Sequence, residues 1–121
     1  MKPINIKEKH ALFSKQWHPH RIATVDDMQV ILAKIKGEFV WHSHEEEDEL
    51  FQVIKGTLYM QFRDRTEVVK EGELIVVPKG VEHNPSTKNG EEVHLLLFEK
   101  LNTAHTGTVA HELTQTEYPL I

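Results

Sequence analysis

The sequence contains no cysteine, no long apolar run and no excess of basic residues. The absence of cysteine excludes disulfide scaffolds, thiolate metal sites and cysteine nucleophiles. No uninterrupted apolar stretch is longer than Leu95–Phe98, whereas a membrane-spanning helix needs roughly 20 residues, and Met1–Phe13 lacks the apolar segment of a secretory signal. With 14 basic and 19 acidic residues, the formal charge of −5 argues against a nucleic-acid or anionic-membrane partner. We therefore expect a cytoplasmic protein that binds neither nucleic acid nor membranes.

The pattern of the chain predicts a single all-β domain over residues 1–121, in which 39% of the residues are hydrophobic and 27% charged. Asn5–Lys15 has partial helical spacing, with Asn5 as the N-cap. From Arg21 onward, short apolar runs of period two alternate with turn residues, which predicts strands with no helix between them. The predicted strands are Arg21–Val25, Met28–Lys36, Phe39–Ser43, Leu50–Lys55, Thr57–Arg63, Thr66–Lys70, Glu73–Val77, Val81–Pro85 and Val93–Phe98.

Such a series of strands predicts an antiparallel sandwich or barrel whose core spans about residues 21–98. A short helix precedes it, and the polar stretch Glu99–Ile121 is expected to form an irregular C-terminal tail over the surface.

Four residues form a candidate metal site. His42 and His44 share one face of a strand because side chains two residues apart point the same way. Glu49 follows after a plausible bend, and His83 follows a rigid Pro-x-Gly turn that can deliver a third imidazole. Three imidazoles and one carboxylate suit one divalent transition metal, namely iron, manganese, nickel, cobalt, copper or zinc. Histidine pairs are also common on exposed strands, so the prediction depends on the combination of all four residues.

The two stretches that carry these residues resemble the two signature motifs of the cupin superfamily. The first motif is matched by Gly37, His42, His44, Glu49 and Gly56, and the second by Gly72, Pro78, Gly80 and His83. The spacer of 15 residues between Gly56 and Gly72 is typical of small bacterial cupins. Thr87 stands where the second motif often has asparagine, and one residue is missing before His42. Neither departure affects a candidate ligand.

This resemblance implies a double-stranded β-helix, or jelly-roll barrel, with one metal inside its mouth. It also implies a homodimer with N-terminal strands packed across the interface, and Leu12, Phe13 and Trp17 give that expectation weak support as apolar residues that a small barrel need not bury alone. The whole chain is similar to the small cupins labelled mannose-6-phosphate-isomerase-like. That label reflects a shared fold, so the activity does not carry over with it.

The candidate site favours a small anionic ligand. Three neutral imidazoles, one carboxylate and a divalent metal sum to about +1. Strand alternation suggests Phe51, Met60 and His94 as substrate-binding residues in a largely apolar wall, although such residues more often belong to the core. The acidic run Glu45–Glu49 is interpreted as a solvated loop in which Glu49 alone turns inward.

Three functions compete on this evidence. The first is a metal-dependent enzyme, of isomerase or dioxygenase type, that acts on a small anionic carbonyl or sugar-like substrate. The second is a non-catalytic ligand-binding or sensor module in which the metal anchors a small acid. The third, a structural or storage protein with a vestigial site, is disfavoured because barrel packing does not require His42, His44, Glu49 and His83 together. The sequence identifies no acid or base beside the site.

Overall fold

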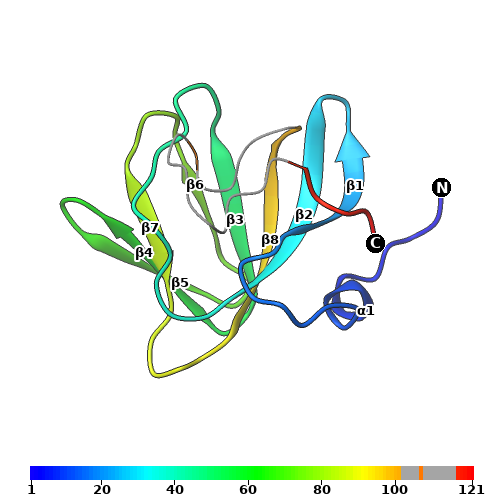
Figure 1. Cartoon of the computed structure of the whole chain (residues 1–121), viewed down its shortest axis with the longest axis horizontal. Helices are drawn as coiled ribbons and strands as arrows, with labels where there is room; N and C mark the ends of the chain where they lie inside the picture. Colours follow the sequence, from blue (N-terminus) through cyan, green and yellow to red (C-terminus); the bar gives the residue numbers. More distant parts are fainter. Residues whose placement is uncertain (102–106, 108–116) are drawn as a thin grey trace.

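The computed structural model describes residues 1–101, 107 and 117–121. These residues form one short helix and eight strands (Figure 1). The elements are α1 (Ile6–His10), β1 (His20–Val25), β2 (Met28–Ile35), β3 (Glu49–Lys55), β4 (Thr57–Phe62), β5 (Thr66–Lys70), β6 (Leu74–Val77), β7 (His83–Ser86) and β8 (Val93–Lys100). Two antiparallel sheets result, one in the order β1-β2-β8-β3-β6 and one in the order β5-β4-β7. The predicted all-β jelly-roll fold is confirmed.

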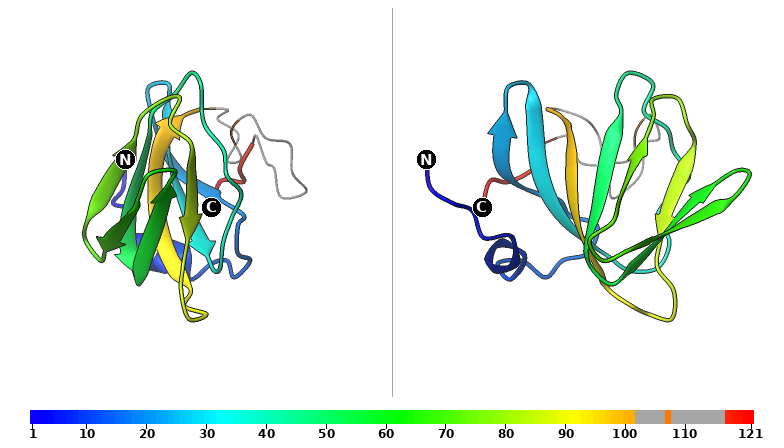
Figure 2. Two further views of the ribbon diagram at one scale, coloured as in Figure 1. Left: turned by 90° about the vertical axis from the view of Figure 1, so that its left-hand side faces the viewer. Right: turned by 180° about the vertical axis from the view of Figure 1, so that it is seen from behind.

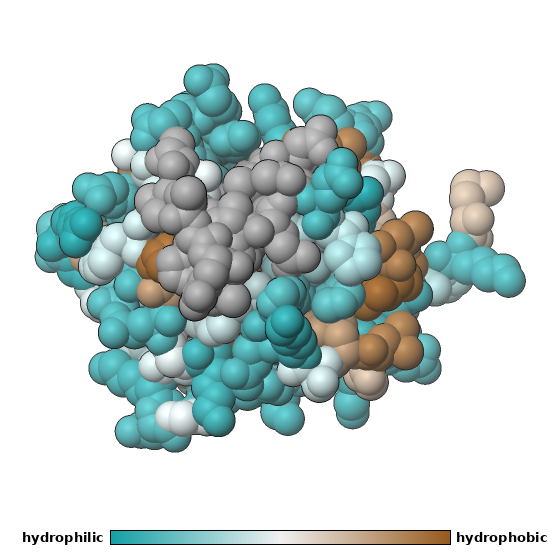
Figure 3. All heavy atoms as spheres, in the orientation of Figure 1, coloured by the Kyte–Doolittle hydropathy of each residue, from teal (hydrophilic) through white to brown (hydrophobic). Residues whose placement is uncertain are grey.

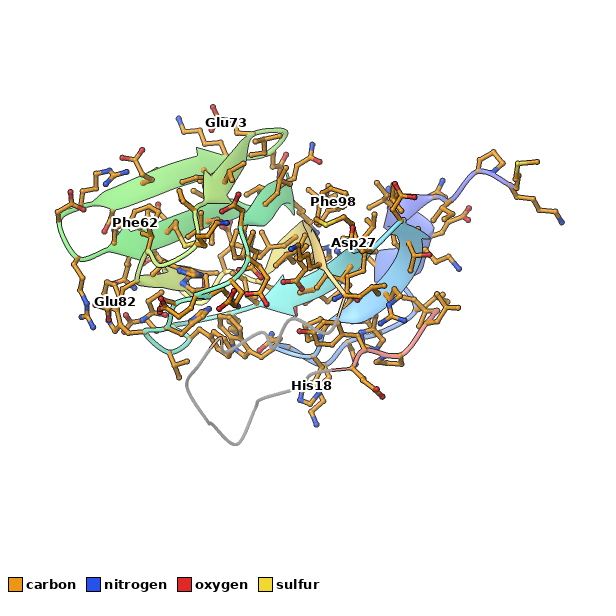
Figure 4. The ribbon with its side chains drawn as sticks, turned by 90° about the horizontal axis from the view of Figure 1, so that it is seen from above. His18, Asp27, Phe62, Glu73, Glu82 and Phe98 are labelled. Atoms are coloured by element: carbon orange, nitrogen blue, oxygen red, sulfur yellow. The ribbon has the colours of Figure 1, made fainter. Side chains whose placement is uncertain are left out.

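The core lies between the two sheets because inward and outward side chains alternate along each strand. On β8 every second residue from Val93 to Leu97 is buried, and Val53 and Met60 pack against this face from β3 and β4. Seen from above, side chains fill the space between the strands, with Phe62 toward the three-stranded sheet and Asp27 at the β1–β2 turn on the opposite side (Figure 4).

The N-terminal segment covers the outer face of β2. The helix begins as predicted, with the Asn5 side chain accepting a hydrogen bond from the Glu8 amide at 2.9 Å. It ends at His10, however, and the predicted continuation to Lys15 is wrong. Beyond the helix the chain crosses β2, where the Lys34 ammonium donates to the Phe13 carbonyl at 2.6 Å. This crossing explains why β2 is buried on both faces near its end.

The predicted strand Phe39–Ser43 is also corrected. This segment runs alongside β7 but pairs with it only at isolated bridges, Glu38 with Ser86 and His42 with His83. Thr87 connects the segment to β7, because its hydroxyl accepts from the Gly37 amide at 2.8 Å and its amide donates to the Gly37 carbonyl at 2.8 Å. Thr87 thus has a structural role in this place.

Much of the predicted irregular tail lies outside the described residues. Its last residues return to β1, where the Arg21 amide donates to the Pro119 carbonyl at 2.9 Å and Leu120 forms a parallel bridge with Arg21. Tyr118 is buried in the core, so the expectation that the stretch from Glu99 onward runs over the surface is wrong there.

The surface is mainly polar, with apolar side chains gathered on one side. Figure 3 shows apolar patches where α1, β1 and the C-terminus lie in Figure 1. Exposed apolar residues of these segments are Ile4, Leu12, Val25 and Leu120. Within the part of the chain that the structure describes, no helix has the length and apolar character needed to cross a bilayer.

Candidate metal centre

Two loops bring the four candidate ligands together at one end of the molecule. The segment that leads into β3 carries His42 and His44, and the β6–β7 connection precedes His83; both lie at the top of Figure 1 and of the reverse view in Figure 2. Backbone hydrogen bonds fix them to each other, since the Gly80 amide donates to the His44 carbonyl at 2.8 Å and His42 and His83 exchange amide–carbonyl bonds at 2.9 and 3.0 Å. Gly80 has φ of 78°, a conformation that favours glycine.

All four side chains are buried and their donor atoms converge. One ligand atom from each of His42, His44, Glu49 and His83 lies within 4.8 Å of the others. Glu49 Oε1 lies 3.4 Å from His44 Nε2 and 3.6 Å from His83 Nε2. Donors that surround one ion at metal–nitrogen distances of about 2.1 Å are separated by about 3–4 Å. The cluster therefore has the dimensions to hold a metal ion.

Backbone carbonyls select which imidazole nitrogen faces the centre. His42 Nδ1 donates to the Val40 carbonyl at 2.8 Å, and His83 Nδ1 donates to the Val81 carbonyl at 2.9 Å. These bonds leave the Nε2 lone pairs free, as metal-ligating histidines require. Within the described part of the chain, Nε2 of His44 and of His83 is buried and forms no hydrogen bond. Buried polar atoms seldom lack partners, so these orphaned nitrogens fit a metal ligand set.

The electrostatics of the cluster also fit a cation. Burial, followed by the neighbouring His83, lowers the pKa of His42 to about 4, so this imidazole is neutral at pH 7. Burial opposes the charge on Glu49, but the neighbouring His44, His83 and Glu99 side chains outweigh it and hold the pKa of Glu49 well below its usual range. For His44, burial is outweighed by the neighbouring Glu49 carboxylate, which raises the pKa of His44. A bound metal ion would replace the proton of His44 in balancing the negative charge of the Glu49 carboxylate.

The remaining acidic residues behave as a solvated loop. Glu45, Glu46 and Asp48 are exposed and Glu47 is half-buried, whereas Glu49 is only 2% exposed at the start of β3. The Asp48 carboxylate accepts from the Lys79 amide at 2.9 Å, which links this loop to the β6–β7 connection.

A cavity of about 40 Å³ lies beside the cluster. Phe51 lines it, together with His42 and Glu49, and its ring meets the His83 ring edge-on at 6.1 Å. The structure does not bring the other two suggested residues to this cavity. Met60 is fully buried in the core and is not among the lining residues. His94 lies on the outer face of β8, where it stacks on His10 at 4.9 Å, because it alternates with the inward residues Val93 and Leu95.

Glu99 and Gly107 also lie at the site and were not predicted from the sequence. Glu99 is fully buried, and its carboxyl oxygens form no hydrogen bond within the described residues. Burial together with the neighbouring Glu49 raises the pKa of Glu99 well above the usual range. Its inward position could have been predicted from the sequence, because Glu99 continues the inward alternation of β8. Gly107 packs against the site from the C-terminal segment, because a Cβ there would overlap the Ser43 carbonyl and lie 3.2 Å from His42 Cδ2.

The sequence and the fold match those of known proteins. The protein-family model for the cupin domain matches residues 28–99. The chain belongs to the cupin family. This cupin is 43% identical over 79 residues to the uncharacterised Bacillus subtilis protein YdbB, a match that covers 64% of each chain and so spans less than two thirds of that relative.

Two solved structures extend the match. A cupin-2 domain protein from Shewanella frigidimarina is 44% identical, with a TM-score of 0.78 over 80% of this chain and 93% of the other. A protein from Neisseria meningitidis is 32% identical, with a TM-score of 0.73 over 82% and 99% of the two chains. The resemblance seen in the sequence motifs is thereby confirmed at the level of the family.

Proposed function

We propose that this cupin is a metal-dependent enzyme that binds one divalent transition metal and acts on a small anionic carbonyl compound. His42, His44, Glu49 and His83 are the proposed ligands, and the metal is iron, manganese, nickel, cobalt, copper or zinc. The observation that carries the proposal is the convergence of four buried donors, two with orphaned nitrogens, on a point beside a cavity. A ligand set next to a cavity suits a reactive site, whereas structural sites are closed.

Each residue has a defined part in the proposed site. His42 and His83 present Nε2 because carbonyl oxygens hold their Nδ1 protons, and Glu49 supplies the one negative charge of the ligand set. When bound, the metal would supply a Lewis acid for a carbonyl oxygen or, with iron or copper, redox chemistry with dioxygen. The buried Glu99 carboxyl lies next to Glu49 and would hold a proton beside this ligand.

The test combines two activity assays on protein loaded anaerobically with each metal in turn. Exchange of α-protons into deuterated water, followed by NMR, reports isomerase-type proton abstraction from small anionic carbonyl compounds. Oxygen consumption with the iron and copper forms reports dioxygenase-type chemistry. We expect turnover in at least one assay that is lost on chelation and in His44→Ala. Binding of such anions without turnover would favour the alternative, a non-catalytic binding or sensor module with the metal as anchor.

We further propose that this cupin forms a homodimer in the cytoplasm. The support is the gathering of exposed apolar residues, Ile4, Leu12, Val25 and Leu120, on the side formed by the chain ends and β1. Phe13 and Trp17 do not add to it, because their rings stack within the chain on His20 at 4.2 Å and on Phe39 at 4.6 Å.

A further inference from the structure

The cavity beside the metal cluster is almost wholly apolar. Of its twelve described lining residues, ten carry apolar side chains, and the other two are the proposed ligands His42 and Glu49. Ile31, Ala33, Leu95 and Leu97 form its floor on β2 and β8. Among the described residues, a ligand that reaches the metal therefore has an apolar surface beside it, with the polar side chains of His42 and Glu49 at the metal end.

Trp17 and Phe39 form the aromatic wall of the cavity next to the ligands, and hydrogen bonds and ring stacking hold this wall in place. Trp17 has φ of 65°, a backbone conformation that residues other than glycine rarely adopt. Its amide donates to the Lys34 carbonyl at 2.8 Å, and its indole nitrogen donates to the Lys36 carbonyl at 3.2 Å. The indole stacks on Phe39 at 4.6 Å, and Phe39 in turn meets the His42 ring edge-on at 5.7 Å. The aromatic wall is thus packed directly against a proposed metal ligand.

Among the described residues, the cavity offers no cationic side chain to a second anionic group. The described lining residues include neither lysine nor arginine. A phosphate or a second carboxylate placed here would lose its hydration without a cationic partner. An alkyl group would gain from the same transfer. The chemistry of the wall therefore discriminates against phosphosugars and dicarboxylates.

We propose that the ligand of this site is a chelating monoanion with a short uncharged aliphatic body, of which short-chain α-keto acids are the simplest examples. This inference rests on the proposed function, since the metal holds the oxygen atoms of the ligand. The cavity volume of about 40 Å³ is enough for about three water-sized groups, so the body is of ethyl to isopropyl size. Specificity then comes from the fit of the body in the cavity.

Calorimetric titration of the zinc-loaded protein tests this, because zinc has no redox chemistry. Pyruvate, α-ketobutyrate and α-ketoisovalerate share one chelating head and differ only in the size of the body. We expect affinity to rise about fourfold for each added carbon. α-Ketoglutarate, with a charged tail, should bind at least tenfold more weakly than α-ketobutyrate, and a hexose monophosphate should bind more weakly than both. Equal affinity for all the keto acids, or tighter binding of the charged ligands, would overturn the inference.

Two variants locate the effect in the cavity. Ala33→Leu fills the space, so the gain from a larger body should disappear while zinc still binds at one per chain. Ala23→Leu on β1, which is not among the lining residues, is the matched control and should retain the gain. If Ala33→Leu does not fold, Leu97→Ala provides the reverse test by enlarging the cavity, and the preferred body should become longer.

Different results of the titration would contradict the proposed function and the inference about the cavity. If the protein binds no zinc, or if the zinc form binds none of these anions, the proposed function fails. If the zinc form binds them without regard to the body, the inference about the cavity fails and the metal site stands.

Discussion

Replacing His44 with alanine removes one of the four donors and should abolish stabilisation by metal. His44 Nε2 lies 3.4 Å from Glu49 Oε1 inside the cluster and forms no hydrogen bond within the described residues. A metal present at a thousand times its dissociation constant stabilises the native protein by about 4 kcal/mol. For a chain of 121 residues, this corresponds to a rise of about 15 °C in the melting temperature.

The assay compares melting temperatures with and without added metal, by calorimetry, for each form of the protein. Taking the difference removes the effect of His44→Ala on the metal-free protein, where Glu49 loses a buried partner. His18→Ala, which changes a histidine of the turn before β1, is the control and should keep the full shift. A shift of the same size in His44→Ala and in the unmodified chain would refute the ligand assignment.

Three further predictions address proton competition, the buried acid and assembly. The pKa of His44 is raised, so a proton competes with the metal for this imidazole already near neutral pH, and metal affinity measured by calorimetry should fall about tenfold per pH unit below about 6.5. His42, with a pKa of about 4, adds to this fall only near pH 4. Constant metal affinity down to pH 5 would contradict histidine ligation. The pKa of Glu99 is raised in the folded protein, so the contribution of this residue to stability is lost as pH rises above its pKa in the unfolded chain. Glu99→Gln should therefore make the metal-free protein more stable to urea at pH 7, and the difference should vanish toward pH 4. A variant that is less stable than the unmodified chain at pH 7 would refute this prediction. Light scattering of the unmodified protein should give the mass of two chains. Leu12→Glu should reduce this to the mass of one chain, whereas the control Leu74→Glu, on β6, should keep the mass of two. A monomeric unmodified protein would refute the dimer.

Most of the fold could be predicted because its physics is local. Alternation of apolar residues defined the strands, and glycines with positive φ, such as Gly56 and Gly72, mark turns between them. The segment Phe39–Ser43 has the same alternation, yet a strand needs a continuous partner and β7 offers only isolated bridges. The helix ended early for a comparable reason, since the residues after His10 contact β2, and such tertiary contacts are not visible in a local pattern.

The candidate ligands could be named from the sequence, but their surroundings could not. The motif spacing placed His42 and His83 together, and the structure pairs them through backbone hydrogen bonds. The aromatic wall depends on the unusual backbone of Trp17, which no local rule predicts for tryptophan. By contrast, the outward position of His94 and the inward position of Glu99 both follow from alternation along β8, once that strand is extended to Lys100.

The most direct test of the central claim is the metal content of the protein purified anaerobically, without a nickel column or a chelator. Plasma mass spectrometry should find close to one divalent transition metal per chain, and less than a tenth of that in the double variant His42→Ala, His83→Ala. An unmodified chain without metal, or a double variant that keeps the full amount, would contradict the account.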